Sequence, residues 1–569
     1  MSNNEAVEIA TISVANYLLM RLEELGLDSV FQVPGDYVQE FMNALEEYPN
    51  IQPVGDIDEL GAAYAADAYA RLTGIGAISV QYGVGTFSAL NAVAGSYVER
   101  NPVVVITASP SAADRQIAKD KGVLFHHSTG KLNADQTVFK NVTVAAEIIS
   151  DTRFAPEQID SALVAAITHK RPIYIEAYQN VWGEYCPPPQ GQLAPLETVT
   201  NITFLEDALA LALRKIEHAQ QPIIMLGIEI ARFGLETAAQ ALLDKSGIPY
   251  TTTTLAKSVL DENNAQFLGT YAGPASSIAT NQYVIEADCI IALGCIFTDD
   301  YLDMMANQYE QMIEVNIEHT RVDSSQFSGI NLGTFITSLS ELMGQDSAYP
   351  RTFNGTPNLS ANTAIKTGVL NEELSYTRFF DTFSTFFHDN NRFDDIHLIL
   401  GESSSLYTAS NLTGLPKDCF IANAAWGSLG HETGAATGVA FASDKRPIVV
   451  AGDGGFMMMC QALSTISRNQ LNAVVFVMSN QVYAIEQAFV SLAAFEPDGE
   501  FAPFDILPTW DYLSLAQAFG VSGFKVSTVA ELQEVLTQLD QQQDTAALVE
   551  VVIPEKDLAP QIRRLAEPS

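Results

Sequence analysis

Two short segments in the last third of this 569-residue chain constrain its fold more than any other feature. Segment 447–451 is apolar and β-branched, which predicts a buried strand, and it leads into the turn Gly452-Asp453-Gly454-Gly455. Segment 457–468 then carries apolar residues at helical spacing, and a second apolar run, 473–478, ends at Ser479-Asn480. This order of strand, turn, helix and strand is typical of a parallel α/β sheet.

Asp453 and Asn480 each follow one of these two predicted strands. Ligands bind beyond the carboxyl ends of parallel strands, so we expect both side chains at one edge of the sheet. Mg²⁺ prefers hard oxygen ligands and often shares them with substrate phosphates. The glycines leave N–H groups free to face an anion. The pattern therefore predicts a magnesium–diphosphate site, and the alternative is an ordinary turn in which Asp453 caps a helix.

The same constellation resembles the thiamine-diphosphate signature, in which Gly-Asp-Gly is followed by a helix, a strand and then asparagine. The resemblance implies thiamine diphosphate and Mg²⁺ as cofactors, with Asp453, Asn480 and the backbone oxygen of Val482 as the metal ligands. The family more often has asparagine where this chain has Ser479, and glycine where it has Val482. Because valine resists positive φ, we expect this corner to be built differently here.

The first third of the chain resembles the 2-oxo acid decarboxylases of this superfamily. Segment 31–37 resembles a strand followed by their Gly-Asp-Tyr turn, and segment 58–71 resembles the helix that presents their activating glutamate. The resemblance implies that Glu59 hydrogen-bonds the aminopyrimidine ring of the cofactor. Considered alone, Glu59 is also the residue type that complements a helix N-terminus.

Decarboxylation with this cofactor leaves an enamine that must be protonated before an aldehyde is released, so proton donors near neutral pH are needed. His126-His127 matches the paired histidines of pyruvate decarboxylase and its relatives, and segment 483–486 matches their Tyr-Thr-Ile/Val-Glu. The implied catalytic residues are Glu59, Asp36, His126, His127 and Glu486. Considered alone, the histidines could be a solvated pair, Asp36 a turn residue and Glu486 a surface acid.

Segment 426–430 matches the family's Trp-Gly-x-Ile-Gly turn, which implies that Leu429 bends the cofactor and that Gly427 offers it a carbonyl. The implied cofactor-binding residues are Glu59, Ser403, Ser405, Gly427, Leu429, Asp453, Gly454, Gly455, Asn480 and Ile485. Ser405 aligns with an Asp or Thr of the relatives, which favours the decarboxylases of longer 2-oxo acids. Segment 504–512 favours the same group, whereas segment 487–503 departs from the family and is expected to line or cover the substrate pocket.

Length and hydrophobic patterning predict an α/β protein with three doubly wound parallel-sheet domains, because single cores rarely grow beyond about 300 residues. Apolar runs at 222–227, 289–294 and 312–316 predict the strands of the middle block, which lacks a dinucleotide glycine fingerprint. We expect a pyrimidine-binding domain at 1–190, a central Rossmann-like domain at 191–345, a linker at 346–374 and a diphosphate-binding domain at 375–569.

The chain carries 68 acidic and 29 basic residues, giving a net charge of −39. This charge argues against nucleic acid and anionic membranes as partners, and adaptation to salt is a hypothesis for it. The absence of a long apolar run or a basic-then-apolar N-terminus predicts a cytoplasmic protein. The five cysteines are scattered, which indicates buried thiols rather than a disulfide or metal framework.

The leading hypothesis is non-oxidative decarboxylation of a small-molecule 2-oxo acid to an aldehyde and CO₂. One alternative is an acyloin-forming carboligase, and another is a non-catalytic binding or structural protein with this fold. The retained Glu59, His126, His127, Asp453 and Glu486 argue against the non-catalytic protein. In this family two chains contribute the two halves of each site, which implies a homodimer at minimum and leads us to expect a homotetramer.

Overall fold

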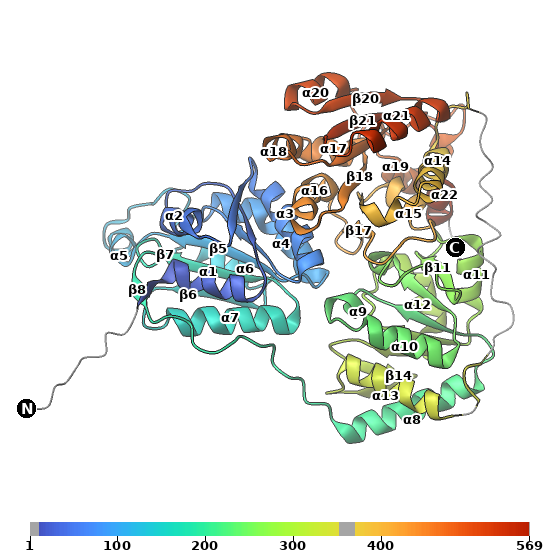
Figure 1. The fold of residues 1–569 in the computed structure, drawn as a ribbon, viewed down its shortest axis with the longest axis horizontal. Helices are drawn as coiled ribbons and strands as arrows, with labels where there is room; N and C mark the ends of the chain where they lie inside the picture. Colours follow the sequence, from blue (N-terminus) through green and yellow to red (C-terminus); the bar gives the residue numbers. More distant parts are fainter. Residues whose placement is uncertain (1–10, 347, 352–369, 568–569) are drawn as a thin grey trace, which may run out of the picture. The chain divides into compact units, whose positions relative to one another are not determined.

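A computed structural model describes residues 11–346, 348–351 and 370–567 of the chain, so most of the predicted linker at 346–374 lies outside the described residues. The backbone forms two compact units (Figure 1). The first comprises the chain up to Leu196 together with Thr437–Ala442, and the second comprises Glu197–Ala436 and the residues from Ser443 onward. Each unit is built on parallel sheets flanked by helices, which confirms the predicted α/β class.

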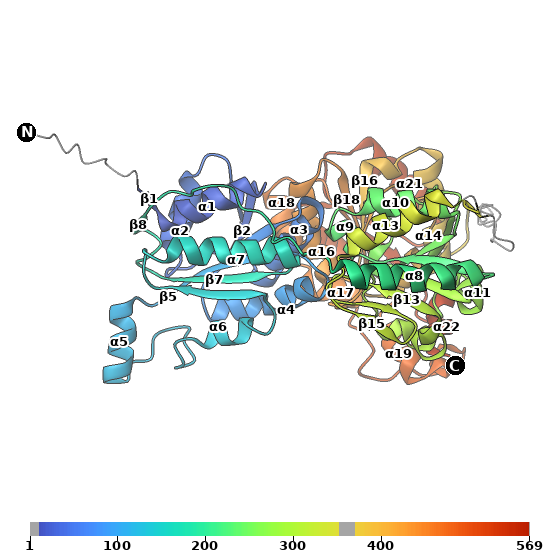
Figure 2. The same ribbon diagram turned by 90° about the horizontal axis from the view of Figure 1, so that it is seen from below.

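The first unit contains a six-stranded parallel sheet in the order β3-β2-β4-β5-β7-β6. Its strands are β2 (Ser29–Gln32), β3 (Gln52–Gly55), β4 (Gly76–Ser79), β5 (Val103–Ser109), β6 (Ala145–Ile149) and β7 (Ile173–Tyr178). Helices cover both faces of this sheet (Figure 2). They are α1 (Val14–Glu24), α2 (Gln39–Glu47), α3 (Glu59–Thr73), α4 (Val84–Val98), α5 (Ala112–Lys121), α6 (Ala134–Phe139) and α7 (Ala155–His169). A short antiparallel pair, β1 (Ile12–Ser13) with β8 (Tyr185–Cys186), accompanies the sheet.

The second unit contains two sheets, and the first of them is seven-stranded in the order β11-β10-β9-β12-β13-β14-β15. Its strands are β9 (Pro222–Leu226), β10 (Tyr250–Thr253), β11 (Phe267–Tyr271), β12 (Cys289–Leu293), β13 (Met312–Val315), β14 (Thr320–Val322) and β15 (Ser325–Phe327). The predicted strands at 222–227, 289–294 and 312–316 are confirmed as β9, β12 and β13. The last two strands pair antiparallel, so this sheet is mixed rather than wholly parallel. Its helices are α8 (Ile202–His218), α9 (Glu229–Arg232), α10 (Glu236–Ser246), α11 (Ile278–Glu286), α12 (Leu302–Gln308) and α13 (Leu332–Gln345).

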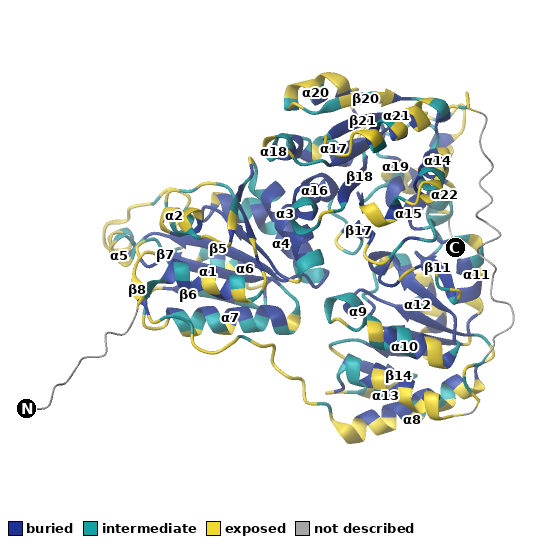
Figure 3. Cartoon of the chain, in the orientation of Figure 1, coloured by how far each residue is buried: buried dark blue, intermediate teal, exposed yellow. Residues whose placement is uncertain are grey.

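The C-terminal sheet is six-stranded and parallel, in the order β17-β16-β18-β19-β21-β20. Its strands are β16 (Ile396–Leu400), β17 (Phe420–Ala422), β18 (Arg446–Gly452), β19 (Val474–Ser479), β20 (Ser522–Val526) and β21 (Ala547–Val552). Strands β16 to β19 and β21 are almost wholly buried, whereas the edge strand β20 is only partly buried, and the helices at 512–519 and 529–541, α20 and α21, expose their outer sides (Figure 3). The helices are α14 (Tyr376–Asp389), α15 (Ser404–Ala409), α16 (His431–Ala442), α17 (Asp453–Met459), α18 (Ala462–Arg468), α19 (Ala484–Val490), α20 (Tyr512–Phe519), α21 (Val529–Gln541) and α22 (Pro560–Ala566).

The helix predicted at 457–468 is different in the structure. Helix α17 already begins at Asp453, immediately after β18, and the chain turns at Cys460-Gln461 before α18 begins. The glycines of the turn therefore form the first turn of α17, where four backbone N–H groups have no partner within the helix. This start places free N–H groups directly at the carboxyl edge of the sheet.

A buried ion pair joins the central and C-terminal parts of the second unit. Lys257 Nζ lies 2.9 Å from Glu262 Oε1 and donates to the carbonyl of Leu412 at 2.6 Å, while Glu262 Oε2 accepts from the N–H of Leu415 at 3.2 Å. Both side chains are almost fully buried. Lys417 and Glu236 form a second pair between the same two regions, at 2.8 Å, with the lysine 45% exposed.

The carboxyl of Glu432, in the first turn of α16, fills a space left by two glycines. A Cβ atom at Gly401 would lie 2.5 Å from Glu432 Cδ, and one at Gly455 would lie 2.7 Å from Oε1. Glu432 is 1% exposed, and its Oε2 has no hydrogen-bond partner among the described residues. Burial raises the pKa of Glu432 from 4.5 to about 7, although the N–H groups of Gly430 and Glu432 itself oppose the shift.

Replacing Lys257 by methionine should lower the free energy of unfolding by about 3–5 kcal/mol, because Glu262 would remain buried without its cation. The matched substitution Lys417→Met breaks an exposed pair between the same regions and should cost less than about 1 kcal/mol. Urea unfolding of the apoprotein followed by circular dichroism measures both changes. Equal losses in the two variants would contradict the importance of the buried pair.

Glu432 should make the unfolding free energy fall as pH rises from about 4.5 to about 7. In this window the unfolded chain releases the proton while the folded chain keeps it, so the folded state loses stability relative to the unfolded state. In Glu432→Gln this contribution, about 2–3 kcal/mol, should be absent. Urea unfolding at pH 4.5 and 7.5 measures it, and the exposed Glu534→Gln serves as the control. A slope in Glu432→Gln equal to that of the wild type would refute the assignment.

Candidate active site

Asp453 and Asn480 meet at the carboxyl edge of the C-terminal sheet, as the sequence predicts. Strands β18 and β19 run side by side, with Gly452 opposite Met478. Asp453 Oδ2 accepts the backbone N–H groups of Asn480 at 3.1 Å and Gln481 at 2.7 Å, and Oδ1 accepts that of Gly454 at 2.9 Å. One carboxylate therefore ties together the ends of two strands and the start of α17.

The environment of Asp453 suits a cation. The side chain is 3% exposed, and burial raises its pKa to about 6, with the three N–H donors acting against that shift. Among the described residues no group of three or more His, Cys, Asp and Glu side chains gathers in a metal-binding arrangement. A cation here would therefore need neutral oxygens beside the single carboxylate, and Mg²⁺ commonly completes such a set with phosphate oxygens and water.

Besides Glu432 Oε2, two more buried polar groups near this edge have no hydrogen-bond partner among the described residues. They are Nδ2 of Asn480, in a residue that is 1% exposed, and Oγ of Ser405, which is fully buried in the first turn of α15. Because nearly all buried polar groups in proteins are hydrogen-bonded, Asn480 Nδ2, whose residue lines the cavity at this edge, indicates a polar ligand or water there; Ser405 lies outside that lining. The donor set fits a diphosphate.

A cavity of about 80 Å³ opens at this edge. Its lining includes most of the residues that the sequence predicts for the diphosphate half of the site: Ser403, Leu429, Asp453, Gly454, Gly455, Asn480, Val482, Ile485 and Glu486. Tyr376, Glu402, Ser404, Gly452, Tyr483 and Ala484 complete it and were not predicted. Gly427 and Ser405 lie outside the lining, as does all of segment 487–503, which was expected to line or cover the substrate pocket.

The corner after Asn480 does not place Val482 in a left-handed conformation. The positive φ, +62°, occurs at Gln481, whereas Val482 is outside the positive region. Val482 is 2% exposed and pairs with Ile506 in an antiparallel bridge. The ring of Tyr483 lies against Gly454, where a Cβ atom would be 2.2 Å from Tyr483 Cε1. Glycine is therefore required at position 454 by this close approach.

The turn at 426–430 presents Leu429 to the cavity. Its conformation depends on positive φ at Gly427, +67°, and Gly430, +88°. The preceding Asn423 holds the turn, because its backbone carbonyl accepts the N–H of Gly427 and its Oδ1 accepts that of Ser428, both at 2.9 Å. Asn423 directly follows a buried strand, as Asn480 does. This position in the sequence could have identified Asn423 as a candidate site residue.

In the first unit, Glu59 is the first residue of α3. The side chain of Asp58 caps this helix and accepts the N–H of Leu60 at 2.7 Å, so capping does not require Glu59. A Cβ atom at Gly85, near the start of α4, would lie 3.4 Å from Glu59 Oε1. The carboxylate of Glu59 is therefore directed to the turn that comes after β4.

Asp36 also lies beside this turn. Its Oδ1 accepts from Gln81 Nε2 at 2.6 Å, and the Asp36 side chain lines an open hollow of about 520 Å³ on this unit. Gln81 in turn lies close to Gly85, so one glutamine connects the surroundings of Asp36 and Glu59. Gln81 was not predicted from the sequence; it lies two residues after the end of β4 and two before Gly83.

His126 and His127 occupy an exposed turn that is fixed to the same region. The Tyr82 hydroxyl donates to the carbonyl of His126, and a Cβ atom at Gly83 would lie 2.0 Å from the carbonyl of His127. The His127 ring lies edge-on to that of Tyr82, with centroids 5.9 Å apart. Asp135, also missed, accepts the N–H of Gly83 at 2.6 Å. The structure thus gathers Asp36, Glu59 and both histidines around residues 81–85.

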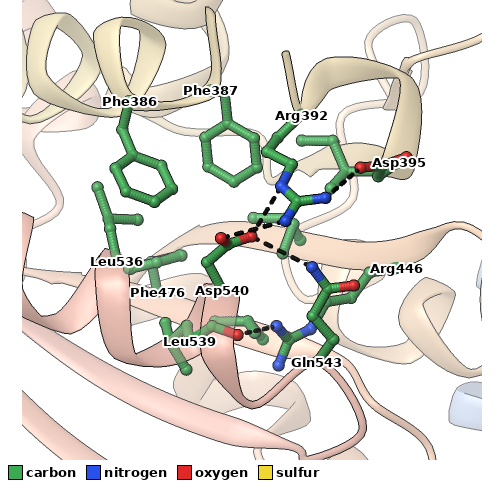
Figure 4. A pocket seen from close by; sticks show the side chains of 13 residues that line it. Phe386, Phe387, Arg392, Asp395, Arg446, Phe476, Leu536, Leu539, Asp540 and Gln543 are labelled. Atoms are coloured by element: carbon green, nitrogen blue, oxygen red, sulfur yellow. Dashed lines mark hydrogen bonds and ion pairs between the residues drawn. The ribbon is translucent and has the colours of Figure 1, made fainter. Parts of the chain in front are cut away.

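A second cavity in the C-terminal part lies at the opposite edge of the sheet (Figure 4). It is lined by Ile396, Arg446 and Val474, which begin β16, β18 and β19, and measures about 40 Å³. Asp540 bridges Arg392 and Gln543 across it, while Arg446 donates to the carbonyl of Leu539 at 2.7 Å. Ligands of parallel sheets bind at the carboxyl edge, so this cavity is a packing feature and not the site.

All five cysteines are free thiols, and four of them are buried. Burial raises the pKa of Cys186 to about 11 and that of Cys419 to about 12, which makes them inert. Helices long and apolar enough to cross a membrane are absent from the described part of the chain.

Comparisons with known proteins agree with this geometry. The chain matches the thiamine pyrophosphate enzyme models for the N-terminal TPP binding domain at residues 12–137, the central domain at 209–336 and the C-terminal TPP binding domain at 403–551. It is 30% identical over 583 residues to an alpha-keto-acid decarboxylase of Mycobacterium avium, covering 100% of this chain and 99% of the relative.

Two further relatives span nearly the whole chain. A pyruvate decarboxylase of Kluyveromyces lactis is 28% identical, with 96% of this chain and 97% of the relative covered. Pyruvate decarboxylase isozyme 3 of Saccharomyces cerevisiae is also 28% identical, with 96% of each covered. With matching models in all three regions and a relative aligned from end to end, the chain belongs to the thiamine-diphosphate-dependent 2-oxo acid decarboxylase family.

Proposed function

We propose that this protein converts a 2-oxo acid to an aldehyde and CO₂ with the help of thiamine diphosphate and Mg²⁺. The proposal rests on one arrangement: Asp453 accepts the backbone N–H of Asn480, and Asn480 Nδ2, which has no partner in the described part of the chain, lies beside a glycine turn and a cavity. Glu486 lines that same cavity, so an acid lies beside the place where the cofactor would bind. The names of the relatives support the same reaction class.

The C-terminal residues would hold the cofactor through its charged end. Asp453, the side-chain oxygen of Asn480 and the carbonyl of Val482 would bind Mg²⁺, and the N–H group of Gly455 would face the diphosphate, with Gly454 leaving room beside it. Ser403 and Ser405 would add hydroxyl donors. Gly427, Leu429 and Ile485 would contact the rings. When bound, thiamine diphosphate supplies a nucleophilic carbon and accepts the electron pair released as CO₂ leaves.

The acidic and imidazole side chains would donate and accept protons during the reaction. Glu59 would hydrogen-bond the pyrimidine end of the cofactor, a role that its position opposite Gly85 permits. Glu486, Asp36, His126 and His127 are the groups that would deliver the proton needed before aldehyde release. Glu486, His126 and Asp36 are exposed, so each can exchange protons with solvent when the site is open.

We propose further that two copies of the chain complete each site, with a homodimer as the minimum and a homotetramer as the assembled form. Glu59 belongs to the first compact unit and Asp453 to the second, so each unit by itself carries half of the chemistry. In a homodimer with twofold symmetry, a single interface forms two identical shared sites. We also propose a cytoplasmic location, supported by five free thiols, which persist in reducing compartments.

With thiamine diphosphate and Mg²⁺, the purified protein should release aldehyde and CO₂ in equal amounts from at least one member of a panel of aliphatic, branched and aromatic 2-oxo acids. Glu59→Gln should bind the cofactor but lose about 100-fold or more in turnover, because the neutral amide cannot share a proton with the pyrimidine. The exposed Glu47→Gln is the control. Full activity in Glu59→Gln would disprove the role of Glu59, and ligation faster than aldehyde release would identify a carboligase instead.

Mixing the inactive variants Glu59→Gln and Asp453→Asn should restore about a quarter of wild-type activity if subunits exchange into dimers. Half of the dimers would then be mixed, and one of their two sites would contain both intact residues. Activity measured after co-refolding, with the mass determined by light scattering, tests this expectation. No recovery despite demonstrated mixing, or an active monomer, would contradict the shared site.

A further inference from the structure

Lys556 lies in the connection between β21 and α22, and its ammonium is surrounded by main-chain carbonyls from one segment. Nζ lies 3.2 Å from the carbonyl oxygen of Ala494, 2.7 Å from that of Glu496, 3.4 Å from that of Pro497 and 2.6 Å from that of Gly499. The ring centroid of Phe501 lies 5.6 Å from the same nitrogen. One lysine therefore contacts five residues of segment 491–503.

This segment is tightly folded around the ammonium. A Cβ atom at Gly499 would lie 2.3 Å from the carbonyl oxygen of Ala493, so the chain packs backbone on backbone there. Phe495 and Phe501 pack edge to face at 5.3 Å, and the buried Gln487 accepts the N–H of Ala502 at 2.5 Å. Convergent carbonyl dipoles repel one another, so this fold depends on the cation at its centre.

Both ends of the segment are attached to the candidate site. Its start follows α19, which carries Ile485 and Glu486 into the cavity. Beyond its end, residues 505–507 pair with the loop that contains Val482. Tyr483 N–H donates to the carbonyl of Asp505, and Leu507 N–H donates to that of Gln481, both at 2.9 Å.

We propose that Lys556 is a positioning residue, which organises segment 491–503 and thereby fixes the loop that offers the Val482 carbonyl and the helix that presents Glu486. The inference rests on the proposed function of that loop and helix. The path from the ammonium to the site runs through main-chain hydrogen bonds on one side and through the start of α19 on the other. Arg563 lies 3.7 Å from Glu496 and is a second cation close to this segment.

Lys556→Met keeps most of the apolar stem and removes the ammonium. It should raise the Mg²⁺ concentration for half-maximal thiamine-diphosphate binding roughly tenfold and lower kcat more than it changes KM. It should also speed chymotrypsin cleavage after Phe495 or Phe501 in the apoprotein at least severalfold. Lys525→Met is the matched control, because Lys525 pairs with Glu550 on β21 rather than with this segment.

Chemical rescue separates positioning from general destabilisation. In Lys556→Ala, propylammonium replaces the missing methylenes and ammonium, and it should restore Mg²⁺-dependent cofactor binding and protease resistance together. Equal Mg²⁺ titrations in Lys556→Met and the wild type, equal losses in Lys525→Met, or no rescue would overturn the proposal. Failure of the wild type to bind thiamine diphosphate would contradict the proposed function. Unchanged chymotrypsin cleavage of the Lys556→Met apoprotein would show, independently of that function, that Lys556 does not hold the segment.

Discussion

The contact on which the site depends is the carboxylate of Asp453 accepting three main-chain N–H groups. Through it the end of β18, the start of α17 and the residues after β19 share one buried oxygen pair. Because burial raises the pKa of this carboxylate, the three donors favour its charged form, and one of them, the N–H of Gln481, belongs to a residue in the left-handed conformation. The same hydrogen bonds therefore favour a charged carboxylate, which suits a cation, and hold the backbone of the loop in place.

The surrounding framework repeats this arrangement in each unit. In the first unit the turn after β4 collects Asp36 through Gln81 and the histidine turn through Tyr82. In the second unit the turn at 426–430 depends on Asn423, and segment 491–503 depends on Lys556. The candidate functional side chains thus stand on loops and in the first turns of helices at the carboxyl edges of sheets, while buried or half-buried polar side chains near them hydrogen-bond to the loops.

Sequence reasoning could predict the features that depend on local rules. Parallel strands place the residues after them at one edge, so Asp453 and Asn480 could be brought together from the sequence, and apolar runs such as 222–227 indicated the α/β class. It could not predict Gln81 or Asp135, whose partners are more than 40 residues distant. The antiparallel strands β14 and β15 are short and polar, and give no apolar run to detect. The break between α17 and α18 lies within a continuous helical pattern, and the roles assigned to the site residues remain predictions.

The placement of the basic side chains affects how the acidic surface of this protein interacts with dissolved ions. Lys257, Arg446 and Lys556 all direct their charge toward main-chain carbonyls in the second unit rather than toward surface carboxylates. With 68 acidic residues and only 29 basic ones, each cation drawn inward leaves the outer acids with fewer fixed neighbours of opposite sign. Their mutual repulsion must then be moderated by dissolved counterions, so the ionic atmosphere becomes part of what keeps the folded chain compact.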